Sequence, residues 1–375
     1  MASSLHLTLL VGPAVPAPTP AFVVDALQSV QVTVSAGQRS GFQLTFMPDR
    51  NSPLQTLFLV SGGAIPPILR VILVATLNGT PEVLIDGVMT HHEASPSAEP
   101  GKSTLTVTGE DLSAAMDLID FSGLPYPAMP AEARVALIVA KYALFGMIPM
   151  VIPSVFIDVP IPVERIPTHQ GTDLHYLQQL ADEAGYVFYI TPGPSPGTNI
   201  AYWGPEIKVG PPQPTLNVNM DMHTNVDAIS FRFDSEGKTL PVLFIQNQQT
   251  KIPIPIPIPD ISPLNPLLGL MPPIPKRIEP ISGTAKLSPA RAALLGLAKA
   301  SRSSDVVTGA GSLDVLRYGR PLKARGLVGV RGAGLAFDGL YYVKSVTHNI
   351  ERGKYTQSFT LTRNGLISTV PGAPA

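Results

Sequence analysis

Cysteine is missing altogether from this chain of 375 residues. Without cysteine there is no disulfide framework, no thiolate nucleophile and no cysteine-based zinc or iron–sulfur site. Charged residues are also few, at 14% of the chain, while hydrophobic residues make up 45%. This composition excludes a disordered chain and is typical of a globular protein long enough for two or three domains.

The beginning of the chain lacks the basic residues that open a secretion signal. The first lysine or arginine is Arg39, and the stretch LHLTLLV is a poor apolar core for such a signal. Long apolar runs are missing too, because Pro149 and Pro153 interrupt the most hydrophobic stretch, which runs from Tyr142 to Ile157 and is shorter than a membrane helix. We therefore expect no Sec signal, assembly in the cytoplasm of the producing cell and no membrane span.

The net charge of −1 conceals two regions of opposite charge. Residues 82–183 hold fourteen acidic and four basic residues, whereas residues 317–363 hold nine basic and two acidic ones. This pattern has two possible explanations. The charges are simply solvated on the surface, or the two regions form a self-complementary contact between subunits. The basic region lacks a nucleic-acid-binding motif, so no nucleic-acid specificity is expected. The contact between subunits would use Arg317, Arg320, Lys323 and Arg325.

Proline is the residue present in excess, with 41 copies, of which ten lie between Pro253 and Pro280. The stretch KIPIPIPIPD, from Lys251 to Asp260, alternates isoleucine with proline. Proline fixes φ and has no N–H, and the residue before it avoids the helical region, so this stretch is predicted to be extended. Its apolar faces are unfavourable in water unless another protein surface covers them. Our hypothesis is that residues 251–275 lie extended against a neighbouring subunit or another protein of the same assembly, with the isoleucine edge offering hydrogen bonds; a floppy surface insertion is the alternative. The isoleucines concerned are Ile252, Ile254, Ile256 and Ile258.

Alternating apolar and polar residues indicate short β-strands towards both ends of the chain. The stretch LQSVQVTVSAGQRSGFQLTF, which begins at Leu27, is predicted to form a hairpin, and the stretch that begins at Leu69 adds another with Asn78-Gly79 as its turn. Near the other end, KARGLVGVRG, GLYYVKSVTHNIE and KYTQSFTLTRN are further strands. Both ends are interpreted as barrel-like.

Helical periodicity appears in four places between and beside these strands. In TGEDLSAAMDLI, a helix would place Leu112, Met116 and Ile119 on one face, with Thr108 and Asp111 as a capping pair.

The other three helices are predicted mainly from their ends. One follows Pro130 and ends at Gly146, and a second has Thr172 as N-cap and Gly185 after its last residue. The fourth has Ser288 as its N-cap.

These elements predict an α+β protein that is mainly β. Two antiparallel β-barrel domains would flank an α/β middle region, and the similar layout of the outer parts hints at a diverged duplication without a visible repeat. The boundaries expected are 1–21 for a proline-rich N-terminal segment, 22–120 for the first barrel with its exit helix, 121–214 for the middle domain, 215–368 for the second barrel with a Pro/Ile-rich insertion at 250–282, and 369–375 for a tail.

Motifs that suggest catalysis do not withstand a physical test. The stretch GPSPG at 193–197 has the spacing of a nucleophile elbow, but Pro196 lacks the N–H that would serve as an oxyanion donor. The stretch HHE at 91–93 ends a predicted strand without metal-ligand spacing, and His169 and His175 have no third ligand nearby in sequence. We expect no catalytic residues, no cofactor and no metal site.

Three stretches, in order, carry a family resemblance. QGTDLHYLQQLADEAGYVFYI resembles the helix and strand shared by the phage late control D proteins and the hub of type VI valine-glycine repeat spikes. RYGRPLKARGLVGVRGAGLAFDGLYYVKSVTHNIERGKYTQSFTLTRNGL resembles the last barrel of that family, and VTGEDLSAAMDL resembles the exit helix of its first barrel. Order and spacing agree over roughly residues 25–368.

The resemblance implies a structural baseplate hub of a contractile tail or a phage-like contractile injection system. In that family three subunits form a ring with pseudo-sixfold symmetry, which joins a hexameric inner tube to a trimeric spike. The implied partners are two further copies, a spike on a separate chain, the inner tube protein and other baseplate components. The implied location is a virion-like or injection-system particle that can become extracellular on release. The Ile-Pro insertion is not part of the family pattern.

Two other functions remain open. A tail-associated peptidoglycan hydrolase could be built on the same hub scaffold, although no segment is free to form a separate catalytic domain. A tip or hub protein of a non-contractile phage tail would use a similar scaffold. Neighbouring genes for a sheath and a tube would distinguish the latter from a contractile hub.

Overall fold

The computed structural model describes residues 5–48, 54, 68–97, 99, 102–154, 159–163, 166–246, 253–258, 264–281 and 289–369. The first β region begins earlier than the sequence patterns suggested, because Leu5–Gly12 forms a strand inside the segment expected to be only proline-rich. Its strands are β1 (Leu5–Gly12), β2 (Ala17–Pro18), β3 (Leu27–Ser35), β4 (Gly41–Phe46), β5 (Arg70–Leu77), β6 (Thr80–Ser95) and β7 (Thr104–Asp111).

The second β region is built from strands in the last half of the chain. The structure confirms strands in the three C-terminal stretches that the alternation pattern predicted. The strands are β11 (Gln213–Asn217), β12 (Ala228–Phe233), β17 (Val307–Asp314), β18 (Leu327–Arg331), β19 (Gly339–Glu351) and β20 (Lys354–Arg363).

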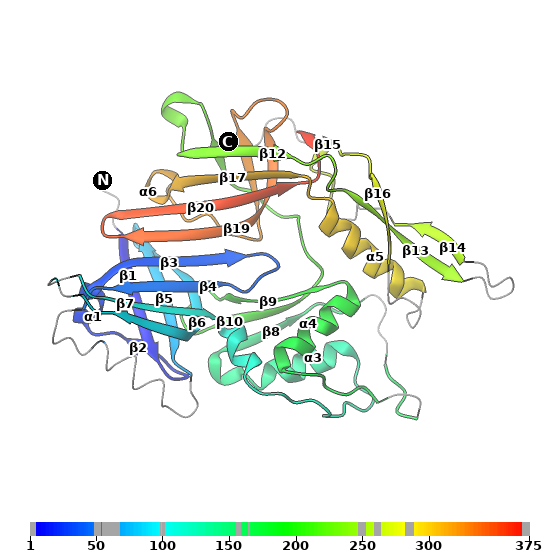
Figure 1. The fold of residues 1–375 in the computed structure, drawn as a ribbon, viewed down its shortest axis with the longest axis horizontal. Helices are drawn as coiled ribbons and strands as arrows, with labels where there is room; N and C mark the ends of the chain where they lie inside the picture. The colour runs from blue at the N-terminus through cyan, green and yellow to red at the C-terminus, as the bar shows by residue number, and fades with distance from the viewer. Residues whose placement is uncertain are drawn as a thin grey trace.

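A single sheet of thirteen strands runs through both β regions (Figure 1). Its order is β12-β17-β20-β19-β3-β4-β7-β6-β5-β1-β2, and β18 pairs with β19 and β11. Strands β3 and β19 pair antiparallel from Ser29↔Glu351 to Ser35↔Ser345. The sequence predicted two separate barrels; instead, the strands of the two β regions pair into one continuous sheet, and no closed barrel is found in the described part of the chain. Each region uses the other to cover a strand edge that a barrel would have closed on itself.

The two β regions also share one apolar core. Alternate residues of the central strands point into it, as a sheet with one buried face requires. The core includes Val32, Phe42 and Leu44 from the first region and Val328, Val343 and Phe359 from the second.

The middle region combines a small sheet with helices. Strand β10 (Asn199–Gly204) pairs parallel to β8 (Met147–Val151) and antiparallel to β9 (Val187–Pro192). Helices α3 (Ala131–Ala140) and α4 (Asp173–Ala184) contribute to the core of this region, in which Trp203 is fully buried.

Helix α4 forms as the sequence predicted. The Thr172 hydroxyl accepts a hydrogen bond from the His175 N–H at 3.3 Å, so it satisfies one free donor of the first turn. Gly185 ends the helix with φ of 70°, a left-handed conformation that favours glycine. Leu174, Leu177 and Leu180 are buried and form the apolar face of the helix.

Two other helix predictions need correction. The segment after β7 is the 3₁₀-helix η1 (Leu112–Asp117), and it ends before Ile119, which is 59% exposed. Asp111, the last residue of β7, caps it by accepting from the Ser113 N–H at 3.0 Å, whereas Thr108 lies three residues earlier in the strand. Helix α3 begins after Pro130 as predicted but ends at Ala140; the 3₁₀-helix η2 (Ala143–Phe145) then continues the chain to Gly146.

The proline-rich insertion forms an arm that extends away from the body (Figure 1). Strand β13 (Thr239–Gln246) lies between β14 (Pro253–Pro257) and β16 (Arg277–Pro280), and α5 (Pro289–Ser303) packs on this sheet. The extended conformation predicted for the Ile-Pro stretch is observed over Pro253–Pro257. Ser288, the predicted N-cap of α5, lies outside the described residues.

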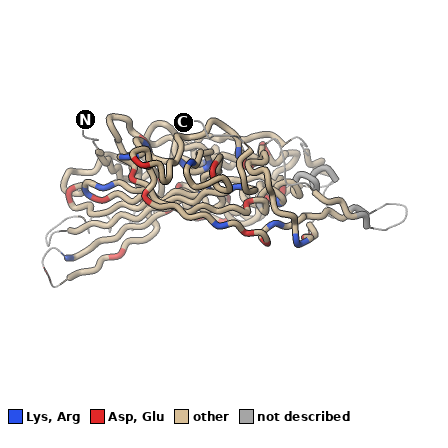
Figure 2. Tube along the Cα trace, turned by 90° about the horizontal axis from the view of Figure 1, so that it is seen from above, with Lys and Arg blue, Asp and Glu red and all other residues tan. Residues whose placement is uncertain are grey.

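Short elements complete the fold, and none of the described helices has the length and apolarity needed to cross a membrane. Viewed from above, lysine and arginine lie interspersed with aspartate and glutamate along the elongated trace (Figure 2). The short elements are α1 (Ala21–Ala26), η3 (Asp221–His223), β15 (Gly269–Met271), α6 (Val315–Tyr318) and β21 (Leu366–Ser368).

Candidate functional site

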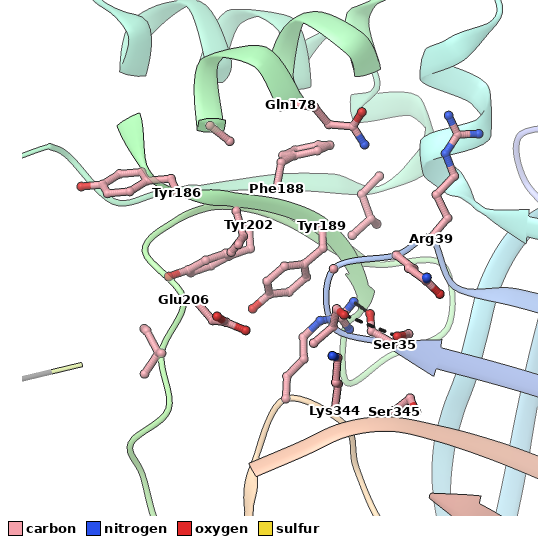
Figure 3. Close-up of a pocket in the computed structure, with 18 of the residues that line it drawn as sticks. Ser35, Arg39, Gln178, Tyr186, Phe188, Tyr189, Tyr202, Glu206, Lys344 and Ser345 are labelled. Carbon is pink, nitrogen blue, oxygen red and sulfur yellow. Dashed lines mark hydrogen bonds between the residues drawn. The ribbon is translucent and has the colours of Figure 1, made fainter. Parts of the chain in front are cut away.

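A cavity of about 970 Å³ lies where the three regions meet. The turn between β3 and β4 lines it from the first β region, α4, β9 and β10 line it from the middle region, and β19 lines it from the second. Figure 3 shows Gln178 on the helical side, Lys344 and Ser345 on the opposite side, and tyrosine rings between them. The cavity therefore depends on the mutual arrangement of all three regions.

Aromatic rings form one wall of the cavity. Tyr189 and Tyr202 are stacked with centroids 4.9 Å apart, and Tyr202 donates its hydroxyl hydrogen to the Pro205 carbonyl at 2.7 Å. Burial raises the pKa of Tyr202 to about 12 and also raises the pKa of Tyr189. Both phenols therefore stay neutral near pH 7 and offer apolar ring surface to an occupant.

Arg325 brings a positive charge to the same wall. Its guanidinium carbon lies 4.1 Å from the centroid of the Tyr189 ring, and its Nη2 donates to the Ser35 carbonyl at 2.6 Å. Its backbone N–H donates to the Val343 carbonyl at 2.9 Å. Desolvation lowers the pKa of Arg325. This one residue thus contacts the end of β3, β9 and β19.

Two of the carboxylates that line the cavity are held by other groups of the protein. Buried Asp111 accepts the backbone N–H groups of Ser40 and Ser113 at 2.8 and 3.0 Å, and burial raises its pKa. Asp305 lies 2.9 Å from the ammonium of Lys208. These contacts use the carboxylates for structure, and they favour a binding cavity over a pair of catalytic acids.

The structure separates the four basic residues that the sequence grouped. Arg317 forms an ion pair with Asp227, and Arg320 is exposed. Lys323 pairs with Glu82 at 3.2 Å, and Arg325 lines the cavity. The acidic and basic regions therefore meet within a single chain at Lys323 and Glu82, and a contact between subunits stays a prediction.

The isoleucines of the insertion have different environments. Ile258 is buried against Leu243 and Ile281 in the arm core, and its N–H donates to the Pro241 carbonyl at 3.0 Å. Ile256 pairs with Leu243 across β13 and is 39% exposed. Ile254 is also in β14, whereas Ile252 lies outside the described residues. The isoleucine edge thus pairs with β13 of the same chain.

The histidines that drew attention in the sequence lie in unrelated places. His91 and His92 are exposed on β6. His169 is buried beside Tyr126, whose hydroxyl lies 2.9 Å from its Nδ1, and desolvation lowers its pKa. Over the described part of the chain, no cluster of histidine and carboxylate side chains could hold a metal ion.

Sequence reasoning missed a network of buried charged side chains where the first β region meets the middle region. Arg70 donates to both carboxylate oxygens of Asp86 at 2.7 and 2.6 Å, and to the carbonyls of Phe145 and Gly197 at 2.8 and 3.1 Å. Asn199 donates to Asp86 at 2.8 Å. A usable signal was present, because Asp86 interrupts the apolar run of a predicted strand.

Comparison with known proteins finds similarity in fold alone. No family model matches the sequence, and no curated protein matches it. The fold resembles that of a tail protein from Neisseria meningitidis MC58, with a TM-score of 0.61, 11% identity and coverage of 97% of this chain and 98% of that one. It also resembles the 43 kDa tail protein of prophage MuSo2 from Shewanella oneidensis, with a TM-score of 0.62, 14% identity and coverage of 96% and 99%.

A third similar structure comes from a secretion complex. A chain of the Francisella PdpA-VgrG complex, in its lidded form, matches with a TM-score of 0.60 and 8% identity. The match covers 99% of this chain and 55% of that one. The chain described here therefore has the fold of phage tail proteins, and this fold also occurs within a larger chain of the Francisella complex.

Proposed function

We propose that this protein is the structural baseplate hub of a contractile tail or a phage-like contractile injection system. The observation that carries the proposal is the agreement in fold with two tail proteins, one of them from a prophage, over nearly the whole length of both chains. Three copies would form a ring with pseudo-sixfold symmetry, joining a hexameric inner tube to a trimeric spike formed by a separate chain. The role is structural rather than enzymatic.

The continuous sheet suits this role. Strands β3 and β19 join the two β regions edge to edge, so each subunit presents two β units in a fixed relative orientation. A trimer of such subunits would present six units to a sixfold tube. The pairing of backbone groups along a whole strand resists shear better than side-chain contacts alone.

The arm offers a surface for a contact in the same assembly. Its sheet has α5 on one face, while on the other face Phe244 is 46% exposed and Ile278 is 71% exposed. Pro255 lies opposite Phe244 across β13 and β14, so proline rings continue this apolar face. We propose that the proline face lies against a neighbouring hub subunit, because the isoleucine edge is already paired with β13.

Imaging of the assembled particle by cryo-electron microscopy tests these statements together. We expect three copies at the junction of tube and spike, a contractile sheath around the tube, and arm density against the next subunit. Quantitative mass spectrometry with labelled peptides checks the count independently. Six copies per particle, or a location away from the baseplate, would refute the hub; a tail without a sheath would instead identify a non-contractile tip.

A further inference from the structure

The cavity where the three regions meet contains a guanidinium without an ion pair at contact distance. Among the described residues, no carboxylate lies within ion-pair distance of Arg325, and its Nε–H is shielded from solvent with no acceptor. A largely buried cation without a contacting counter-ion is unfavourable. Desolvation lowers the pKa of Arg325 despite the attraction of Asp111 and Glu206, although arginine stays charged near pH 7.

The backbone at Arg325 is unfavourable as well. Its φ is 62°, a left-handed conformation that L residues other than glycine, asparagine and aspartate rarely adopt. The hydrogen bond from its N–H to the Val343 carbonyl holds this conformation. Strained residues are concentrated at ligand clamps and active sites, where the surrounding fold maintains them. Strain and an unpaired charge therefore coincide at one residue that faces a cavity.

The surroundings of Arg325 indicate what would balance its charge. Lys344 also lines the cavity, on the side opposite Gln178 (Figure 3), and, like Glu206, has no ion-pair partner in the described ranges. The rings of Tyr189 and Tyr202 supply flat apolar surface next to the guanidinium. Glu206 would repel a ligand that carries several negative charges, so a phosphate is disfavoured relative to a single carboxylate.

We propose that the cavity binds a carboxylate attached to an apolar or aromatic group. The carboxylate pairs with the guanidinium of Arg325 and lies near Lys344, while the attached group packs on Tyr189 and Tyr202. An Asp or Glu side chain of a partner polypeptide and a free organic acid share this chemistry. Both sources would place a negative charge where the three regions meet and so stabilise their arrangement.

Binding of phenylacetate to the purified full-length protein tests the proposal. Ligand-observed NMR is expected to show saturable binding in the millimolar range, and neutral phenylacetamide should not bind. Arg325→Gln should weaken phenylacetate binding by about tenfold or more, since it removes a charge-assisted hydrogen bond. Lys344→Gln should weaken it by roughly two- to threefold. Lys354→Gln changes another exposed lysine outside the cavity and should have no effect.

Wild-type protein supplies a second readout in case Arg325→Gln fails to fold. With ¹⁵N-labelled arginine, phenylacetate should shift the Arg325 Nε–H resonance and leave those of Arg317 and Arg352, which lie outside the cavity, in place. The peptide acetyl-Phe-Asp-Phe-amide distinguishes the two sources: tighter binding than phenylacetate favours a polypeptide, and binding of phenylacetate alone favours a small molecule. Equal binding of phenylacetate and phenylacetamide, or an unmoved Arg325 resonance, would overturn the proposal.

Discussion

The first β region is joined to its two neighbours by different kinds of interaction. Towards the middle region it presents a buried ion pair of its own, since the Arg70 and Asp86 side chains are only 2% and 0% exposed. The hydrogen bonds that cross the boundary run from Arg70 to the carbonyls of Phe145 and Gly197 and from Asn199 to Asp86. It meets the second β region through backbone pairing between β3 and β19, with apolar side chains beneath. We call these the ionic junction and the strand junction.

The two junctions distribute their stabilising contacts differently. At the ionic junction, Arg70 alone contacts Asp86, two carbonyls of the middle region and the Ala14 carbonyl at 2.7 Å. At the strand junction, hydrogen bonds and apolar contacts are spread over many residues. Loss of one side chain should therefore disturb the ionic junction far more, since the remaining buried charge has no replacement for its partner.

The largest effect is expected from Arg70→Ala. The substitution leaves Asp86 buried, and among the described side chains Asn199 is then its one remaining hydrogen-bond donor. Breaking a buried ion pair in this way costs about 3–5 kcal/mol in the free energy of unfolding. Urea denaturation followed by tryptophan fluorescence measures the loss, because Trp203, the single tryptophan, lies in the core of the middle region.

Two further variants make this test specific. Arg39→Ala breaks a partly exposed pair with Glu110 and Asp117 and should cost less than about 1 kcal/mol. Replacing both partners, Arg70→Met with Asp86→Leu, should cost less than Arg70→Ala alone, because no unpaired charge remains. A double variant as unstable as the single one would show that the contacts to backbone carbonyls, rather than the ion pair, hold this junction.

The strand junction should instead be sensitive to acid. His348 lies opposite Val32 of β3, is buried, and places its Nδ1 2.7 Å from the hydroxyl of Tyr355. Burial lowers the pKa of His348 to about 4, from an unperturbed value of 6.5. Between these values the unfolded chain binds a proton that the folded chain does not. Stability should therefore fall as pH drops from 6.5 to 4, by about 3 kcal/mol in total.

His348→Gln isolates this contribution. Glutamine can accept a hydrogen bond without titrating, so the variant should lose most of the pH dependence that His348 causes, when urea midpoints are compared from pH 7 to pH 4. His92→Gln, at an exposed position, serves as the control. His169 is left unchanged, since burial lowers its pKa too and it contributes in the same direction. Parallel pH profiles for His348→Gln and wild type would refute the assignment.

Local features of the fold could be predicted from sequence, whereas partners distant in sequence could not. Thr172 and Gly185 bound α4 because their effects act within one helical turn. Alternation in β3 and β19 predicted two strands with one buried face each. It specified no partner, so the pairing of residues more than 300 positions apart was missed and two barrels were expected.

The cavity could not be predicted from the sequence for a similar reason. Arg325 was selected as one of several positive charges, although its position depends on contacts with Ser35, Tyr189 and Val343 from three regions. The Ile-Pro stretch illustrates the other limit. Proline chemistry predicted its extended conformation, but it could not show that the nearest available edge was β13 of the same chain.

The smallest effect concerns the surface of the strand junction, where Lys323 of the second β region pairs with Glu82 of the first at 3.2 Å. Their side chains are 65% and 26% exposed, so the pair should contribute less than about 1 kcal/mol. We expect Lys323→Glu to lower the free energy of unfolding slightly, with a smaller loss at 0.5 M salt. Combining it with Glu82→Lys should restore stability, because the reversed charges attract again.

This pair also separates a contact within the chain from a contact between subunits. A double-mutant cycle on the isolated protein should give a coupling energy of roughly 0.2–1 kcal/mol if Lys323 and Glu82 stabilise one chain. The same four proteins can then be scored for particle assembly. If the charge-swapped double variant is stable but does not assemble, Lys323 or Glu82 meets an opposite charge on another subunit, as the uneven distribution of charge along the sequence predicted. If the double variant assembles normally, this part of the basic region serves the single chain, and a contact between subunits would have to involve Arg317 or Arg320 instead.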